Sequence, residues 1–218
     1  MLNSVIFDLD GVIINSEPLM RFAFERAYHE VTRNGQPPIG AFFEHMGKSL
    51  PIICQEIGLP PSFTTVYRRI CCENVHRVNV FPGIEQLLGR LHAEGTQMGI
   101  LTGKELRRTH QILSHFDLQR FFSPVIACDM LSKTKPHPEG IQRILAAHGC
   151  APADAVMVGD AVSDIQCAQR AGVCAIGVTW GINPDHMLDC CQPDYVVHQL
   201  DELQQLLQTM IERKQVAV

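Results

Sequence analysis

Short apolar runs alternate with amphipathic segments of helix length along most of this 218-residue chain. This alternation predicts parallel strands joined by crossover helices, because strands covered by helices on both faces are apolar throughout. We therefore expect an α/β fold with a Rossmann-like parallel sheet. The expected strands span residues 4–7, 97–101, 124–127, 155–158, 174–178 and 195–197, and the expected helices 83–94, 104–115, 138–148, 162–171 and 199–213.

Residues 16–80 interrupt this alternation. They contain no convincing strand, and Pro37, Pro38 and Gly58 divide them into helical segments. A single crossover between parallel strands needs only about a dozen residues, so this segment is too long for one. We expect an inserted α-helical cap subdomain at 16–80 and a catalytic core formed by 1–15 and 81–218.

Composition excludes several classes of protein. With 18 basic and 23 acidic side chains, the net charge is −5, so nucleic acid is not an expected partner. The pairs Arg68–Arg69 and Arg107–Arg108 are interpreted as solvated helix faces. No apolar run approaches the ~20 residues that span a bilayer, and the N-terminal segment lacks the features of a secretion signal. We expect a cytoplasmic protein without a membrane partner, either a monomer or a weak homodimer.

Carboxylates follow two of the expected strands. Asp8 and Asp10 come directly after the first strand, and Gly11 allows the chain to turn at once. Asp160 and Asp164 follow the strand at 155–158, just where a helix is expected. Taken singly, the first pair also suits a plain turn or part of a calcium loop, and the second suits a helix cap.

Two other strands end in groups that suit a phosphate. Thr102, Gly103 and Lys104 follow one strand and open an expected helix, where a hydroxyl and free backbone N–H groups can hold an anion. Lys135 precedes Pro136, which fixes an extended loop after another strand. A simple N-cap and an ordinary surface lysine are the alternative interpretations.

All four motifs fall at the carboxyl ends of strands. Ligands of open parallel sheets bind at this edge, so the motifs are expected to meet there. Together they supply carboxylates for a hard cation, a hydroxyl and amides for phosphate oxygens, and one fixed ammonium group. The combination indicates a site for phosphate chemistry.

In this order the motifs closely resemble the four motifs of the haloacid dehalogenase-like hydrolase superfamily, namely Asp8-x-Asp10-Gly11, Thr102, Lys135-Pro136 and Gly159-Asp160-x-x-x-Asp164. The resemblance covers essentially the whole chain. The most similar branch contains phosphoglycolate phosphatases and β-phosphoglucomutases. A weaker likeness, in residues 46–48 and 99–109, is to phosphatases associated with aminohydroxybenzoate-type natural-product synthesis.

The resemblance implies a Mg²⁺-dependent phosphatase that hydrolyses a small phosphorylated metabolite through an aspartyl-phosphate. Asp8 would be the nucleophile and Asp10 the acid/base group. The transferring phosphoryl group would be bound by Thr102, Gly103 and Lys135, with Lys133 as a rival for the lysine role. The Mg²⁺ ligands would be Asp8, the backbone carbonyl of Asp10 and Asp160, and Asp164 would orient them.

Single residues of the motifs and of the expected cap distinguish a phosphatase from the dehalogenases and mutases of the superfamily. Asp10 is absent from the metal-free dehalogenases of the superfamily, so its presence favours phosphoryl transfer. A phosphosugar mutase is the alternative, but Met20 and Met46 replace a histidine and a lysine of the mutase cap. A non-catalytic binding protein on the same fold is a further alternative. In the cap, Lys48 and then His45 are the best candidates for a substrate contact, with solvent exposure as the alternative for both.

Overall fold

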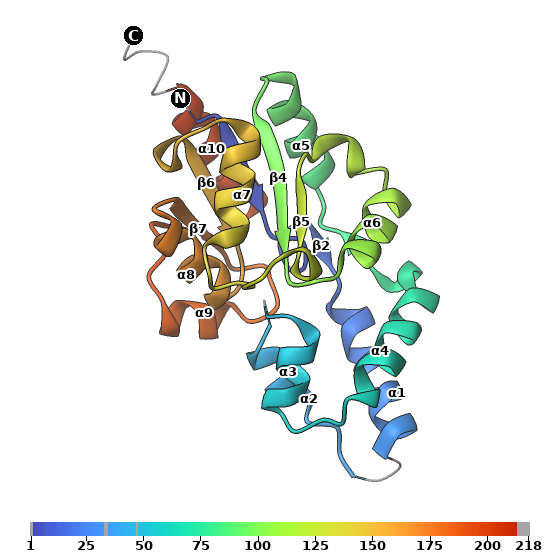
Figure 1. Ribbon diagram of the computed structural model, residues 1–218. Helices are drawn as coiled ribbons and strands as arrows, with labels where there is room; N and C mark the ends of the chain where they lie inside the picture. Colours follow the sequence, from blue (N-terminus) through green and yellow to red (C-terminus); the bar gives the residue numbers. More distant parts are fainter. Residues whose placement is uncertain (1, 33–34, 47, 213–218) are drawn as a thin grey trace.

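The computed structural model describes residues 2–32, 35–46 and 48–212. Parallel strands form one six-stranded sheet in the order β5-β4-β1-β6-β7-β8. Figure 1 shows β4, β5, β6 and β7 of this sheet. The parallel α/β sheet expected from the sequence is therefore confirmed. Its strands are β1 (Ser4–Phe7), β4 (Gln97–Thr102), β5 (Val125–Ala127), β6 (Ala155–Gly159), β7 (Cys174–Val178) and β8 (Tyr195–Val197).

Helices cover both faces of this sheet. Successive side chains of a strand point to opposite faces, so Val5 and Phe7 belong to one apolar cluster and Ile6 to the other. The first cluster includes residues of α5 (Ile84–Ala93), α6 (Leu106–His115) and α10 (Leu200–Glu212). The second includes residues of α7 (Glu139–His148), α8 (Val162–Ala171) and α9 (Pro184–Cys190). Burial on both faces explains why the strands are apolar throughout.

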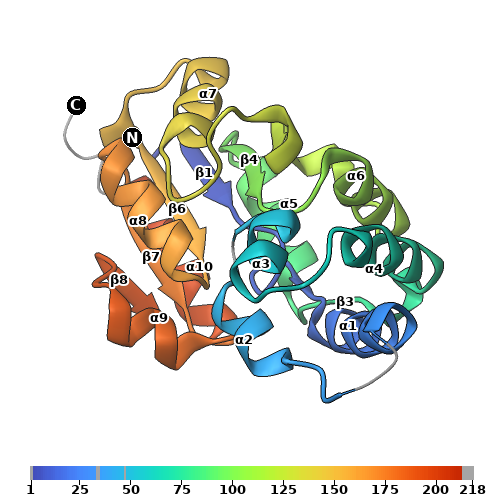
Figure 2. The ribbon, with the colours of Figure 1, turned by 60° about the horizontal axis from the view of Figure 1, so that its bottom comes forward.

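Four helices lie beyond the carboxyl ends of the strands, in the lower half of Figure 1 and toward the viewer in Figure 2. They have an aromatic core, in which the ring of Phe24 lies 4.5 Å from that of Phe42 and 5.0 Å from that of Phe63. Aromatic pairs at this separation add to the free energy gained by burying the rings. The helices are α1 (Glu17–Thr32), α2 (Ile39–Glu44), α3 (Leu50–Glu56) and α4 (Ser62–Glu73).

A short ribbon joins this helical part to the sheet. Strand β2 (Ile14–Asn15) pairs antiparallel with β3 (Asn79–Val80), so the two connections run side by side. The expectation of no strand within residues 16–80 is therefore wrong at β3. A strand of two residues is too short to produce a periodic pattern in the sequence.

Two other details differ from the sequence-based expectation. Helix α6 begins at Leu106 instead of residue 104, because Gly103 to Glu105 form a turn between β4 and the helix. Helix α9 was not expected, and it begins at Pro184, a residue well suited to a first helical turn. Short 3₁₀ helices complete the fold, namely η1 (Val75–Arg77), η2 (Gln119–Phe121), η3 (Cys128–Met130) and η4 (Pro152–Asp154). Within the described residues, no helix combines the length and the apolar character needed to cross a bilayer.

Candidate active site

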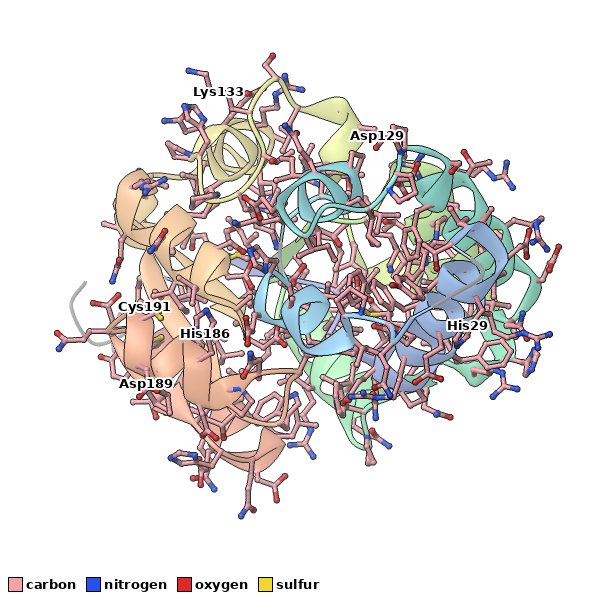
Figure 3. The ribbon with its side chains drawn as sticks, turned by 90° about the horizontal axis from the view of Figure 1, so that it is seen from below. His29, Asp129, Lys133, His186, Asp189 and Cys191 are labelled. Atoms are coloured by element: carbon pink, nitrogen blue, oxygen red, sulfur yellow. The ribbon has the colours of Figure 1, made fainter. Side chains whose placement is uncertain are left out.

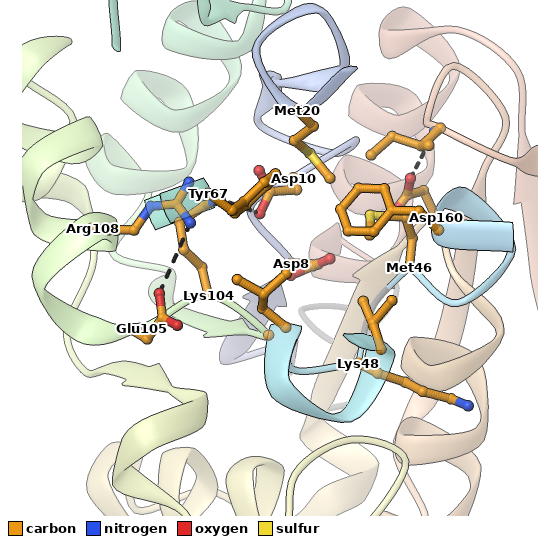
Figure 4. Close-up of a pocket in the computed structure, with 15 residues that line it drawn as sticks. Asp8, Asp10, Met20, Met46, Lys48, Tyr67, Lys104, Glu105, Arg108 and Asp160 are labelled. Atoms are coloured by element: carbon orange, nitrogen blue, oxygen red, sulfur yellow. Dashed lines mark hydrogen bonds and ion pairs between the residues drawn. The ribbon is translucent and has the colours of Figure 1, made fainter. Parts of the chain in front are cut away.

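The strand ends and the four outer helices enclose a cavity of about 60 Å³. Asp8 and Asp10 reach it from the end of β1, and Asp160 reaches it from the end of β6 (Figure 4). Gly11 turns the chain after these aspartates with a φ of +79°, which disfavours other residues. A Cβ at Gly11 would lie 2.0 Å from Oδ2 of Asp160, so only glycine lets these two segments approach each other.

Lys135 lies within a cluster of buried carboxylates. Its Nζ is 3.0 Å from Oδ1 of Asp8 and 2.5 Å from Oδ1 of Asp164. Its exposed fraction is 3%, whereas the rival Lys133 is exposed and lies at the rim of the molecule in Figure 3. The structure thus brings Lys135, and not Lys133, together with the carboxylates.

Burial and mutual repulsion alter the acidity of this cluster. Burial, together with the charges of Asp164 and Asp10, raises the pKa of Asp8 to about 7 despite the opposing effect of Lys135. Burial and the neighbouring Asp8 likewise raise the pKa of Asp160 well above its usual value. One lysine therefore does not compensate the negative charge that these side chains carry when ionised.

The same carboxylates fit a hard divalent cation. Asp8, Asp160 and Asp164 each offer an oxygen within 4.8 Å of the others. Oδ1 of Asp8 is buried and accepts no hydrogen bond of acceptable angle from the described residues, although Lys135 is close. Both oxygens of Asp164 are in use, since Oδ1 contacts Lys135 and Oδ2 accepts the N–H of Ala161 at 3.1 Å. Asp8 and Asp160 thus have coordination capacity that Asp164 lacks.

Asp10 is fixed by two partners. Ser16, the residue before α1, donates a hydrogen bond of 2.5 Å to Oδ1, and Nζ of Lys104 lies 3.1 Å from Oδ2. Burial alone would raise the pKa of Asp10, but the charge of Lys104 and the hydrogen bond from Ser16 lower it. Ser16 was not expected in the site, because a serine at a helix start carries little signal singly. Lys104 was expected there only as part of a helix start whose backbone N–H groups hold a phosphate.

Thr102 ends β4, and Gly103 follows it at the cavity. Gly103 lines the cavity, and Oγ1 of the buried Thr102 accepts the backbone N–H of Lys104 at 3.2 Å. The expected helix N-terminus is not available at this point, because α6 begins later and the N–H of Leu106 donates to Asp129. Any amide contact to a phosphate would therefore come from the turn.

Lys48 and His45, which were expected to contact the substrate, both contact Glu56. Both carboxylate oxygens of Glu56 accept hydrogen bonds from Nζ of Lys48, at 2.9 and 2.8 Å, and Nε2 of His45 lies 3.3 Å from the same carboxylate. Lys48 lines the cavity, but its ammonium points away from Asp8 in Figure 4, and His45 is outside the cavity lining. Gly47, between Met46 and Lys48, lies outside the described residues.

Arg108 and Tyr67 were missed by sequence reasoning. The interpretation of Arg107–Arg108 as a solvated face is wrong for Arg108, which is 7% exposed and lines the cavity. Tyr67 reaches the same cavity from α4 while its ring packs on Phe63. An arginine in an amphipathic helix and a tyrosine at core spacing look ordinary in a sequence, so only the fold identifies them.

Fold and site together define a class of protein. The family described as haloacid dehalogenase-like hydrolase matches residues 5–178, and the chain belongs to this family. The chain is accordingly a hydrolase, as its motifs led us to expect.

The chain is also similar to individual proteins of known name or structure. The chain is 27% identical to pyrophosphatase PpaX of Oceanobacillus iheyensis, covering 93% of this chain and 95% of that protein. It is 28% identical to the phosphoglycolate phosphatase of Escherichia coli K12, covering 93% and 91%. A hydrolase from Pseudomonas syringae has the same fold, with a TM-score of 0.84, 20% identity and coverage of 95% and 98%.

Proposed function

We propose that the protein is a Mg²⁺-dependent phosphatase that hydrolyses a small phosphorylated metabolite through an aspartyl-phosphate. The observation that carries the proposal is the buried carboxylate of Asp8, which faces the cavity beside Lys135, Asp160 and Asp10. Relatives named as a phosphoglycolate phosphatase and a pyrophosphatase support phosphoryl transfer to water.

In the first half-reaction, a carboxylate oxygen of Asp8 attacks phosphorus in line with the ester oxygen. The new Asp8–phosphorus bond forms as the bond to the leaving oxygen breaks. Asp10, when protonated, donates its proton to that oxygen. The contacts of Asp10 with Ser16 and Lys104 hold its carboxyl group at the cavity for this transfer.

In the second half-reaction, the ionised Asp10 takes a proton from water, whose oxygen attacks phosphorus. The bond from phosphorus to Asp8 breaks, and inorganic phosphate leaves. Lys135 offsets the charge of Asp8, and Thr102 and Gly103 border the position of the phosphoryl oxygens.

Mg²⁺ would be held by carboxylate oxygens of Asp8 and Asp160 and by the backbone carbonyl of Asp10. Asp164 would orient this set through Lys135 and the turn at Ala161. Bound there, Mg²⁺ neutralises charge on the phosphoryl group and the nucleophile.

The proposal is tested by measuring phosphate release from p-nitrophenyl phosphate and from a panel of phosphorylated acids, sugars and nucleosides. Rapid acid quenching followed by mass spectrometry should find one phosphoryl group on the peptide that contains Asp8. Turnover without any phosphorylated peptide under single-turnover conditions would argue against the covalent route. A phosphosugar mutase would interconvert sugar phosphates without net release of phosphate.

Asp10→Asn should lower kcat by about 10²–10⁴-fold, because an amide neither donates nor accepts the transferred proton. Both half-reactions should slow, and the amount of phosphorylated Asp8 at steady state will show which slows more. Ser16→Ala is the matched variant, because it keeps the carboxyl group and removes one of its supports. It should cause a smaller loss, and equal losses in the two variants would show that Asp10 acts through position alone.

A further inference from the structure

The cavity has a second charged end, opposite to Asp160. Lys104 and Arg108 line it with side chains that are only 6% and 9% exposed. In Figure 4 they lie on one side of Asp8 and Asp160 lies on the other. Two buried cations at one end of a cavity need a reason, because burial of a charge costs free energy unless it is compensated.

The carboxylates at this end already have cationic partners. Lys104 pairs with Asp10, and the other carboxylate, Glu105, accepts a hydrogen bond of 2.6 Å from Nε of Arg68 on α4. Arg68 and Arg108 therefore share the one carboxylate of Glu105. Of these two arginines, only Arg108 lines the cavity.

Of the two cations that line the cavity, Arg108 has the more distant partner. Its nearest carboxylate oxygen is that of Glu105, at 3.9 Å, which is too long for a hydrogen bond. Among the described residues we find no hydrogen bond from its guanidinium group, which lies 5.7 Å from the ring centre of Tyr67. The cation–π contact holds the group in place and leaves its N–H donors free for a ligand.

We propose that Arg108, assisted by Lys104, binds a second negatively charged group, a carboxylate or a phosphate, on the leaving group of the substrate. The inference rests on the proposed phosphatase function and adds the class of substrate. A guanidinium group binds a carboxylate or phosphate through paired hydrogen bonds. Lys48 is less well placed, because Glu56 accepts two hydrogen bonds from its ammonium group, which points away from Asp8 in Figure 4.

The two ends of the cavity then select different parts of one substrate. Asp8, Asp160 and Asp164 against Lys135 leave two negative charges, which suit a divalent cation and its phosphoryl group. The end at Arg108 offers guanidinium N–H donors and suits the anionic leaving group. Phosphorylated hydroxy acids and diphosphates fit this arrangement, and esters of neutral alcohols use only one end.

The test compares 2-phosphoglycolate with its amide, which keeps the size and removes the charge, and with pyrophosphate. For the wild-type enzyme, kcat/KM should be at least about 10-fold higher for one of the two anionic substrates than for the amide. Arg108→Gln should bring this ratio close to one. Arg107→Gln, an exposed neighbour on α6, is the matched control and should keep the wild-type ratio.

Two results would overturn the proposal: a wild-type enzyme that shows no preference for either anionic substrate, or a preference that survives Arg108→Gln. A preference that disappears in Lys48→Ala instead would assign the contact to the cap lysine. Because the first comparison uses the wild-type protein, it decides even if Arg108→Gln does not fold. If no ester is hydrolysed, the proposed function fails, whereas tighter calorimetric binding of the acid than of its amide would still support this subsite.

Discussion

Asp8→Asn is expected to lower kcat by at least about 10³-fold, which corresponds to roughly 4 kcal/mol of transition-state stabilisation. The amide has nearly the shape of the carboxylate but is a poor nucleophile and a poor ligand for a hard cation. Asp8 is 3% exposed and follows β1 directly, so the backbone places its side chain without help from a mobile loop. The measurement is steady-state phosphate release with saturating substrate and Mg²⁺.

This loss should not come from unfolding. Burial raises the pKa of Asp8, which means that its ionised form is destabilised in the folded, metal-free protein. Removal of that charge should leave the melting temperature in EDTA at pH 8 unchanged or higher. Asp189→Asn, on the exposed face of α9 (Figure 3), is the matched control and should keep full turnover. Near-normal turnover by Asp8→Asn would remove Asp8 from the role of nucleophile.

The strands and the residues at their ends were the predictable part of this molecule. A run such as Val5-Ile6-Phe7 is apolar because helices cover both faces of β1, and this burial is local enough to be read in a sequence. Asp8 and Asp160 follow such runs, so their meeting at one edge follows from parallel pairing of the strands.

Residues whose role depends on the approach of distant segments were not predictable. Arg108 occupies a position in an amphipathic helix that a sequence does not mark as buried. Its side chain lies near Tyr67 and lines the cavity only because α4 packs beside α6. The hydrogen bonds from Lys48 to Glu56 depend on how the chain folds between these two residues, around α3. The ribbon of β2 and β3 is too short to produce a pattern. The motifs in the sequence identify the strand ends that bear catalytic side chains. Tertiary packing determines which charged side chains near those ends can contact a ligand.

Removal of divalent metal should abolish turnover, and Mg²⁺ should restore it. The buried carboxylates of Asp8 and Asp160 require a compensating cation before a phosphate dianion can enter beside them. Ca²⁺ should inhibit, because its larger and less regular coordination would misplace the nucleophile. The measurement is phosphate release after exhaustive dialysis against EDTA, followed by titration with each ion.

The melting temperature tests metal binding at the same site without a measurement of turnover. The folded-state pKa of Asp8, about 7, lies above the usual value of 3.8, so between these pH values the folded protein binds more protons than the unfolded chain. Metal-free protein should therefore lose stability as the pH rises from 5 to 8, and Asp160 acts in the same direction.

Mg²⁺ should raise the melting temperature more at pH 8 than at pH 5, since protons compete for its ligands. Asp160→Asn should reduce this rise, whereas Asp189→Asn should not. Full turnover in EDTA, with a melting temperature that Mg²⁺ leaves unchanged at both pH values, would show that the carboxylate cluster does not bind the metal.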